Sequence, residues 1–160
     1  MQPVQVKKIL LPTDFSEPSA TAEVLGAQLA QKFGASVVLV NVAEDPYVGY
    51  ATNTFPGAPI NLDLDALRTE IQKGCEAKLA EWKAKLPEGV AATARFAFGK
   101  PFVEIIRVCR EEKADLIVLG THGRTGLRHM ILGSVAERVV RKAPVPVLTV
   151  RSGEHHFELP

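Results

Sequence analysis

The chain has 160 residues, 46% of them hydrophobic, and a formal net charge of +1 at pH 7. This size and composition fit one globular domain with a core large enough to fold alone. We assign residues 1–151 to that domain and residues 152–160 to a C-terminal tail. The balanced charge argues against the broad basic surface that binds nucleic acids or membrane lipids non-specifically, and no run approaches the roughly 20 apolar residues of a membrane span. We therefore expect neither nucleic-acid nor membrane binding.

The first half of the chain alternates strand and helix patterns. Residues 8–12 predict a short buried strand, and Ser16 predicts the N-cap of a helix that ends at Gly34. Residues 36–42 are rich in β-branched residues and largely apolar without alternation, with only Ser36 and Asn41 polar, which is typical of a strand buried on both faces. Residues 44–59 combine proline, glycine, tyrosine and asparagine without periodicity, so we expect a long surface loop or lid there.

The second half repeats the alternation. Apolar residues spaced by three and four from Leu64 to Leu86 predict a long helix that ends at Pro87, with Cys75 and Trp82 in the core. The remaining segments predict a strand, a helix, a strand, a helix and a strand, at residues 90–98, 102–109, 115–120, 132–140 and 145–150.

The cysteines and the N-terminus bear on the compartment. Cys75 and Cys109 lie far apart and have no C-x-x-C partner, which fits buried thiols in a reducing environment. The few apolar residues after Lys7 and Lys8 are too short for a signal peptide. We therefore expect a cytoplasmic protein.

Five strands alternating with four helices predict an α/β fold in which helices cover both faces of a parallel sheet through right-handed crossovers, a Rossmann-like arrangement. Pro146 has no backbone N–H to donate, so the last strand is expected at an edge of the sheet. A second copy could pair with the edge from Val145 to Val150, and we expect a homodimer through that strand.

Ligands of open α/β sheets bind beyond the carboxyl ends of the strands, where the strand order reverses. The first segment leaving such an end is Pro12-Thr13-Asp14. Asp14 could accept hydrogen bonds from ribose hydroxyls, or approach a phosphate-bound Mg²⁺ through water. A lone aspartate after a strand could equally cap the following helix. Both interpretations of Asp14 stay open.

The second such segment runs from Gly120 to Ser134 and is rich in glycine. Its backbone N–H groups and the helix starting near Ser134 suit a phosphate group, and the Ser134 hydroxyl could donate to a phosphate oxygen. Ser134 and Glu137 also match a capping box, which would need no ligand. Local positive charge comes from His122, Arg124, Arg128 and His129. We interpret the histidines as basic surface residues, because no set of metal ligands surrounds them.

Several catalytic motifs are missing from the sequence. It contains no G-x-x-x-x-G-K-[ST] phosphate loop, no G-x-G-x-x-G dinucleotide fingerprint and no G-x-S-x-G elbow. No recognised pattern places a base beside Ser134. We therefore expect weak ATPase activity at most.

At these residues the chain resembles the universal stress protein family of UspA-like proteins. The resemblance rests on Leu11-Pro12-Thr13-Asp14-Phe15-Ser16 and on Gly120-x2-Gly123-x9-Gly133-Ser134. The second pattern is similar to the one that marks the ATP-binding branch of the family. The likeness covers about residues 7–151.

The resemblance implies an adenine nucleotide alpha hydrolase-like sheet of order 3-2-1-4-5 and a bound ATP, AMP or ADP, with or without Mg²⁺. Asp14 would contact ribose, and Pro12 and Val42 would flank adenine. The phosphates would lie against Gly120, Gly123, Gly133, Ser134 and Val135, with Thr13, Leu119 and Arg124 as further candidates. The resemblance also implies homodimers that act in stress adaptation.

Three functions follow from these patterns. The first is a nucleotide-binding regulator of dimer shape or partner choice. The second is a slow Mg²⁺-dependent ATP hydrolase or phosphotransferase, and the third is a dimeric interaction module without a nucleotide, in which the glycines serve the turns alone.

Overall fold

The computed structural model describes residues 5–51, 62–121 and 132–151. Strands and helices alternate along the chain as the sequence predicts, with one additional short helix. The strands are β1 (Lys8–Thr13), β2 (Ser36–Ala43), β3 (Ala92–Phe98), β4 (Leu116–Gly120) and β5 (Val147–Val150). The helices are α1 (Glu17–Phe33), α2 (Pro46–Ala51), α3 (Leu64–Ala84), α4 (Pro101–Glu112) and α5 (Ser134–Lys142).

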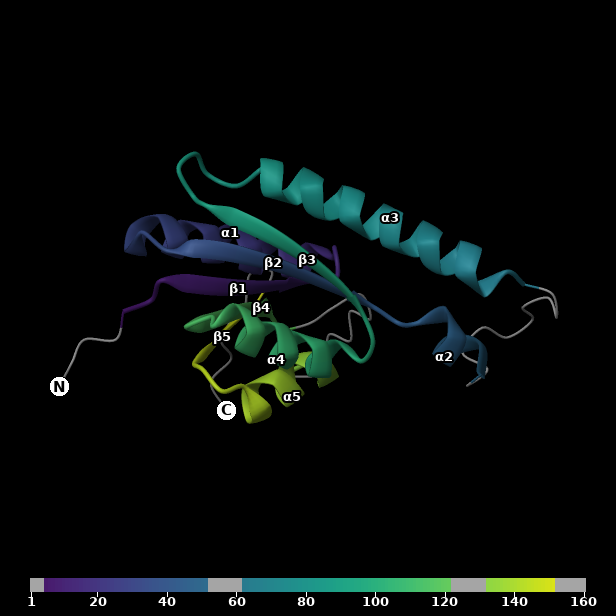
Figure 1. The fold of residues 1–160 in the computed structure, drawn as a ribbon. Helices are drawn as coiled ribbons and strands as arrows, with labels where there is room; N and C mark the ends of the chain where they lie inside the picture. Colours follow the sequence, from purple (N-terminus) through teal and green to yellow (C-terminus); the bar gives the residue numbers. More distant parts are fainter. Residues whose placement is uncertain (1–4, 52–61, 122–131, 152–160) are drawn as a thin grey trace.

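The five strands form one parallel sheet of order β3-β2-β1-β4-β5 (Figure 1). This confirms the predicted Rossmann-like architecture and the predicted strand order. It also places β5, directly after Pro146, at an edge of the sheet. None of the described helices is long and apolar enough to cross a membrane.

Two apolar layers cover the sheet, and the alternation of side chains along β1 assigns residues to them. Leu10 faces the layer formed with α4 and α5, where Ile105, Val108 and Val139 are buried. Figure 1 shows these helices on one side of the sheet and α3 on the other. On that other side, Ile9 and Leu11 pack in the second layer with residues of α1 and α3, including Ala22, Ala30 and Leu79.

Helix α1 begins and ends where the sequence predicts. Ser16 is the N-cap, and it forms a reciprocal capping box with Ser19. Gly34 is the C-cap in a left-handed conformation with φ +65°. Gly26 lets α1 approach β1, because a Cβ atom at this position would lie 2.3 Å from a methyl carbon of Leu11. This close contact fixes the position of the polar first half of α1 against the end of β1.

The segment from residue 44 to residue 59 differs from the predicted loop, because residues 46–51 form α2. The Asp45 side chain accepts a hydrogen bond from the Tyr47 N–H, and the Asp45 carbonyl accepts one from Gly49, so local hydrogen bonds start the helix. Helix α2 has only six residues, and the Tyr47 and Val48 side chains are exposed. The sequence therefore shows no apolar stripe from which this helix could be predicted. The remainder of the predicted loop, residues 52–59, lies outside the described residues.

The side chains of the apolar stripe on α3 are less buried than the sequence predicts. Leu79 is fully buried, but Cys75 and Trp82 are only half-buried, and Trp82 packs against the second core layer from its margin. Cys109, on α4, is buried as expected. Because α3 covers the β2 and β3 side of the sheet at its periphery, one face of the helix is enough to shield the strands.

Candidate functional site

A pocket opens at the carboxyl edge of the sheet where β1 and β4 separate. β1 pairs with β4 at Ile9 and Leu10, whereas its pairing with β2 continues to Thr13. Pro12 lies beyond the last pair with β4, so its missing N–H costs no hydrogen bond to that strand. A proline is therefore tolerated in this central strand, and the gap beside it is the point where the strand order reverses.

The pocket has a volume of about 310 Å³. Nine of the eleven site residues predicted from the sequence line it: Pro12, Thr13, Asp14, Val42, Leu119, Gly120, Gly133, Ser134 and Val135. The other two, Gly123 and Arg124, lie outside the described residues, as do His122, Arg128 and His129. The structure thus brings both predicted segments to one pocket.

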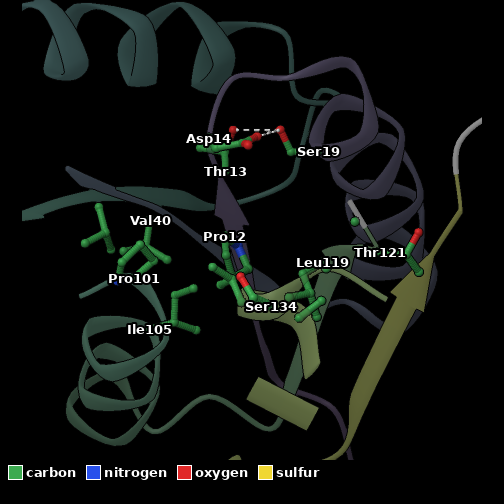
Figure 2. Close-up of a pocket in the computed structure, with 15 residues that line it drawn as sticks. Pro12, Thr13, Asp14, Ser19, Val40, Pro101, Ile105, Leu119, Thr121 and Ser134 are labelled. Carbon is green, nitrogen blue, oxygen red and sulfur yellow. Dashed lines mark hydrogen bonds between the residues drawn. The ribbon is translucent and has the colours of Figure 1, made fainter. Parts of the chain in front are cut away.

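Hydrogen bonds hold the turn after β1 in place. Asp14 Oδ1 accepts from the Ser16 N–H at 3.1 Å, from the Ser16 hydroxyl at 2.5 Å and from the Ser19 hydroxyl at 2.9 Å. Figure 2 shows Asp14 and Ser19 side by side at the pocket. Asp14 therefore supports the start of α1, as the capping interpretation predicts, although Ser16 is the N-cap itself. The same carboxyl group also lines the pocket, so the two interpretations are compatible.

The backbone at Phe15 adopts a left-handed conformation, with φ +62°. Such a conformation costs a non-glycine residue about 1 kcal/mol or more. Two contacts offset this cost: the Phe15 N–H donates to Thr13 Oγ1 at 2.9 Å, and the Phe15 ring packs edge-on against Trp82. Asn41 in turn donates from Nδ2 to the Thr13 carbonyl at 2.8 Å. The turn is thus held by contacts with both α3 and the neighbouring strand β2.

Helix α5 begins at the pocket with Ser134 as its first residue, and Gly133 is the N-cap. The predicted capping box of Ser134 and Glu137 is therefore not formed, because the helix starts one residue earlier than that motif requires and Gly133 takes the N-cap position. Gly133 contributes no side-chain cap, and Glu137 forms an ion pair with Arg141 at 3.1 Å. The N-terminal N–H groups of α5 and the Ser134 hydroxyl are placed at a pocket wall, an arrangement that suits an anion.

Six further residues line the pocket that sequence reasoning did not select: Ser19, Val40, Pro101, Ile105, Thr121 and Ala136. Two of them had a signal in the sequence. Val40 precedes Val42 by two residues on the same strand and so faces the same side, and Ser19 lies one helical turn after the N-cap. Pro101 and Ile105 belong to the N-terminal half of α4, which follows β3 and contacts the pocket only through tertiary packing. The local sequence pattern therefore could not predict them as pocket residues. Figure 2 shows Pro101 and Ile105 across the pocket from Ser19.

Backbone hydrogen bonds connect the pocket to the edge strand. The Gly133 N–H donates to the Thr121 carbonyl at 2.7 Å, and the Thr121 N–H donates to the Val150 carbonyl at 2.9 Å. A displacement of Gly133 would therefore reach the end of β5 through two bonds. In the described part of the chain, no cluster of three or more His, Cys, Asp or Glu side chains could hold a metal ion.

Comparison with known proteins identifies the family. The family model described as the universal stress protein family matches residues 5–151. This chain belongs to the universal stress protein family. Universal stress protein MJ0531 of Methanocaldococcus jannaschii is 38% identical over 149 residues, which cover 91% of this chain and 82% of that protein. Universal stress protein YxiE of Bacillus subtilis is 34% identical over 148 residues, covering 90% and 98% of the two chains.

Solved structures agree with this universal stress protein fold. The structure of protein MJ0577 covers 95% of this chain and all of its own, with a TM-score of 0.77 and 27% identity. A universal stress protein in complex with cAMP covers 93% of this chain and 99% of its own, with a TM-score of 0.65 and 23% identity. A universal stress protein of Archaeoglobus fulgidus in complex with dAMP covers 92% and 98%, with a TM-score of 0.56 and 20% identity.

Proposed function

We propose that this universal stress protein binds an adenine nucleotide, with ATP as the first candidate, in the pocket between β1 and β4. The observation that carries the proposal is the start of α5. The helix dipole, the N-terminal N–H groups and the Ser134 hydroxyl meet at a pocket wall where no side chain caps the helix within the described residues. A phosphate group would supply the acceptors that this helix end lacks.

The rest of the pocket suits the nucleoside. Its apolar lining includes Pro12, Val42 and Ile105, which could enclose an adenine ring, while Asp14 could accept hydrogen bonds from ribose hydroxyls. We extend the phosphate contacts to Gly120, Gly133 and Val135, and to Gly123 and Arg124 by the family pattern. Proteins of this fold have been solved with cAMP and with dAMP, so the fold accommodates adenine nucleotides.

The variant Ser134→Glu tests the phosphate site without disturbing the fold. A carboxylate in the first turn of a helix interacts favourably with the helix dipole, so the variant should stay folded. The same carboxylate repels phosphate, and we expect affinity for Mg-ATP to fall by about 100-fold in calorimetric titration. Thr21→Glu is the matched control, because Thr21 is an exposed hydroxyl residue on α1. Equal affinities of Ser134→Glu and Thr21→Glu would contradict the proposed phosphate position.

We further propose that nucleotide binding regulates a homodimer formed through the strand from Val145 to Val150. Two features support this coupling: β5 lies at the sheet edge with Leu148 partly exposed, and backbone hydrogen bonds run from Gly133 through Thr121 to Val150. If nucleotide binding and dimerisation are coupled in this way, each changes the equilibrium constant of the other by the same factor. Sedimentation equilibrium with and without Mg-ATP measures that factor, and an unchanged monomer–dimer constant would exclude the regulation while leaving nucleotide binding intact.

A further inference from the structure

A second pocket lies on the opposite face of the sheet, between α1 and the C-terminal end of α3. Its volume is about 270 Å³. Apolar side chains form most of its wall, and the exposed residues Lys85 and Gln28 also line it. The apolar wall consists of Ala20, Val24 and Ala27 from α1 and Trp82, Leu86 and Pro87 from α3 and the turn after it.

Glu23 lines this pocket and is only 5% exposed. Its Oε1 atom is buried and accepts no hydrogen bond from any described residue. Burial raises the pKa of Glu23 to about 8; a hydrogen bond with Thr13 lowers it in part, and the charge of Asp14 raises it. A buried carboxyl oxygen without a hydrogen-bond donor costs about 1–3 kcal/mol, and glutamate is rarely buried on a helix face that apolar residues could fill.

We propose that the pocket between α1 and α3 is a binding site for a small organic cation, a primary ammonium group on a compact aromatic or aliphatic body. The ammonium would pair with the carboxyl group of Glu23, which lines the pocket, and lie near the Trp82 ring, where a cation is attracted to the indole face. The hydrophobic body would contact the wall from Val24 to Leu86. The site requires no nucleotide and stands independently of the proposed function.

The charges around Glu23 agree with a cation at the inner end of the pocket. Asp14, at the end of β1, adds negative potential. Lys85, on the α3 side, is exposed to solvent, where its repulsion is screened, and Lys78 lies over the Phe15 ring. Binding of an ammonium ion at pH 7 requires Glu23 to release its proton to the solvent. Affinity should therefore rise by about eightfold between pH 7 and pH 8.5, as the ionised fraction of Glu23 increases.

The single tryptophan of the chain provides a direct readout. Its indole N–H gives one resonance in a ¹H–¹⁵N spectrum, and we expect 2-phenylethylammonium to shift it saturably in the full-length, nucleotide-free protein. Two probes of the same shape separate charge from shape: neutral 2-phenylethanol should bind about tenfold more weakly at pH 8.5, and anionic 3-phenylpropionate more weakly still.

Glu23→Gln and Glu17→Gln form the variant pair. Glu23→Gln keeps the shape of the side chain and should lose about tenfold in affinity for the ammonium probe at pH 8.5, together with its pH dependence. Glu17→Gln removes a charge from an exposed position on the same helix and should change nothing. If Glu23→Gln fails to fold, Glu23→Leu replaces it, since an apolar side chain removes the unsatisfied atom. The absence of a saturable shift at millimolar probe, equal binding of the three probes, or wild-type affinity in the folded Glu23 variant would each overturn the proposal.

Discussion

The pocket between β1 and β4 and the pocket between α1 and α3 each contain one carboxyl group, Asp14 in the first and Glu23 in the second. Asp14 Oδ1 accepts three hydrogen bonds, whereas Glu23 Oε1 accepts none from the described residues. Thr13 is near both carboxyl groups, because it lines the first pocket and its side chain lowers the pKa of Glu23.

This difference shows how the start of one helix produces two unlike sites. The first turn of α1 supplies its N–H groups and serine hydroxyls to the carboxyl that precedes it, so Asp14 is held by donors that exist only at a helix start. Glu23 lies two turns further along, where the backbone N–H groups are bonded within the helix. Its carboxyl therefore meets apolar packing instead, and burial opposes its charge.

The largest expected effect concerns the pH dependence of stability. Folded Glu23 keeps its proton up to about pH 8, whereas the unfolded side chain releases it near pH 4.5. The pH-dependent contribution of Glu23 to the free energy of unfolding is therefore complete below pH 4.5 and is lost as the pH rises through 8. Relative to Glu23→Gln, the wild-type free energy of unfolding should fall by about 1.4 kcal/mol per pH unit, or about 4 kcal/mol between pH 5 and pH 8.

Urea unfolding of the two proteins across this pH range measures the difference. Parallel profiles would mean that Glu23 ionises normally, and the contrast between the two carboxyl groups would disappear. Because Glu23→Gln changes only this group, other titrating residues cancel in the comparison.

A smaller effect is expected for Asp14→Ala. The change removes the acceptor of three hydrogen bonds at the start of α1, so we expect a loss of about 2 kcal/mol in unfolding free energy and about tenfold in nucleotide affinity. Asp63→Ala is the matched control, because Asp63 caps α3 by accepting from the Ala66 N–H. It should lose about 1 kcal/mol of stability and no nucleotide affinity. If both variants bind nucleotide equally, Asp14 acts only on the helix.

The smallest effect is expected for Ser19→Ala, which removes one of the three donors to Asp14 and the reciprocal half of the capping box. Asp14 retains both Ser16 donors, so the loss of stability should be about 1 kcal/mol in chemical denaturation. Ser36→Ala is the control, since the Ser36 hydroxyl donates a single exposed hydrogen bond to Lys7. A loss above 3 kcal/mol would mean that the Asp14 turn depends on Ser19 alone.

The sequence predicted most of the fold because continuous apolar strands and three- and four-residue spacing in helices depend on local pattern. It missed α2, whose exposed tyrosine and valine show no stripe. It left Ser134 undecided because S-x-x-E suits both a cap and a ligand, and the structure decides against the cap by starting the helix one residue earlier, at Ser134. Glu23 gave no signal at all, since a glutamate in a helix is ordinarily exposed. Its burial follows from the face that α1 presents to β1, which Gly26 fixes through its contact with Leu11.

The central claim is adenine nucleotide binding between β1 and β4, and calorimetric titration of the purified, nucleotide-stripped protein with Mg-ATP and with Mg-GTP tests it most directly. We predict saturable binding of Mg-ATP in the micromolar range and markedly weaker binding of Mg-GTP. Folded protein that binds neither nucleotide at millimolar concentration would contradict the claim, and equal affinity for the two would contradict the assignment of adenine.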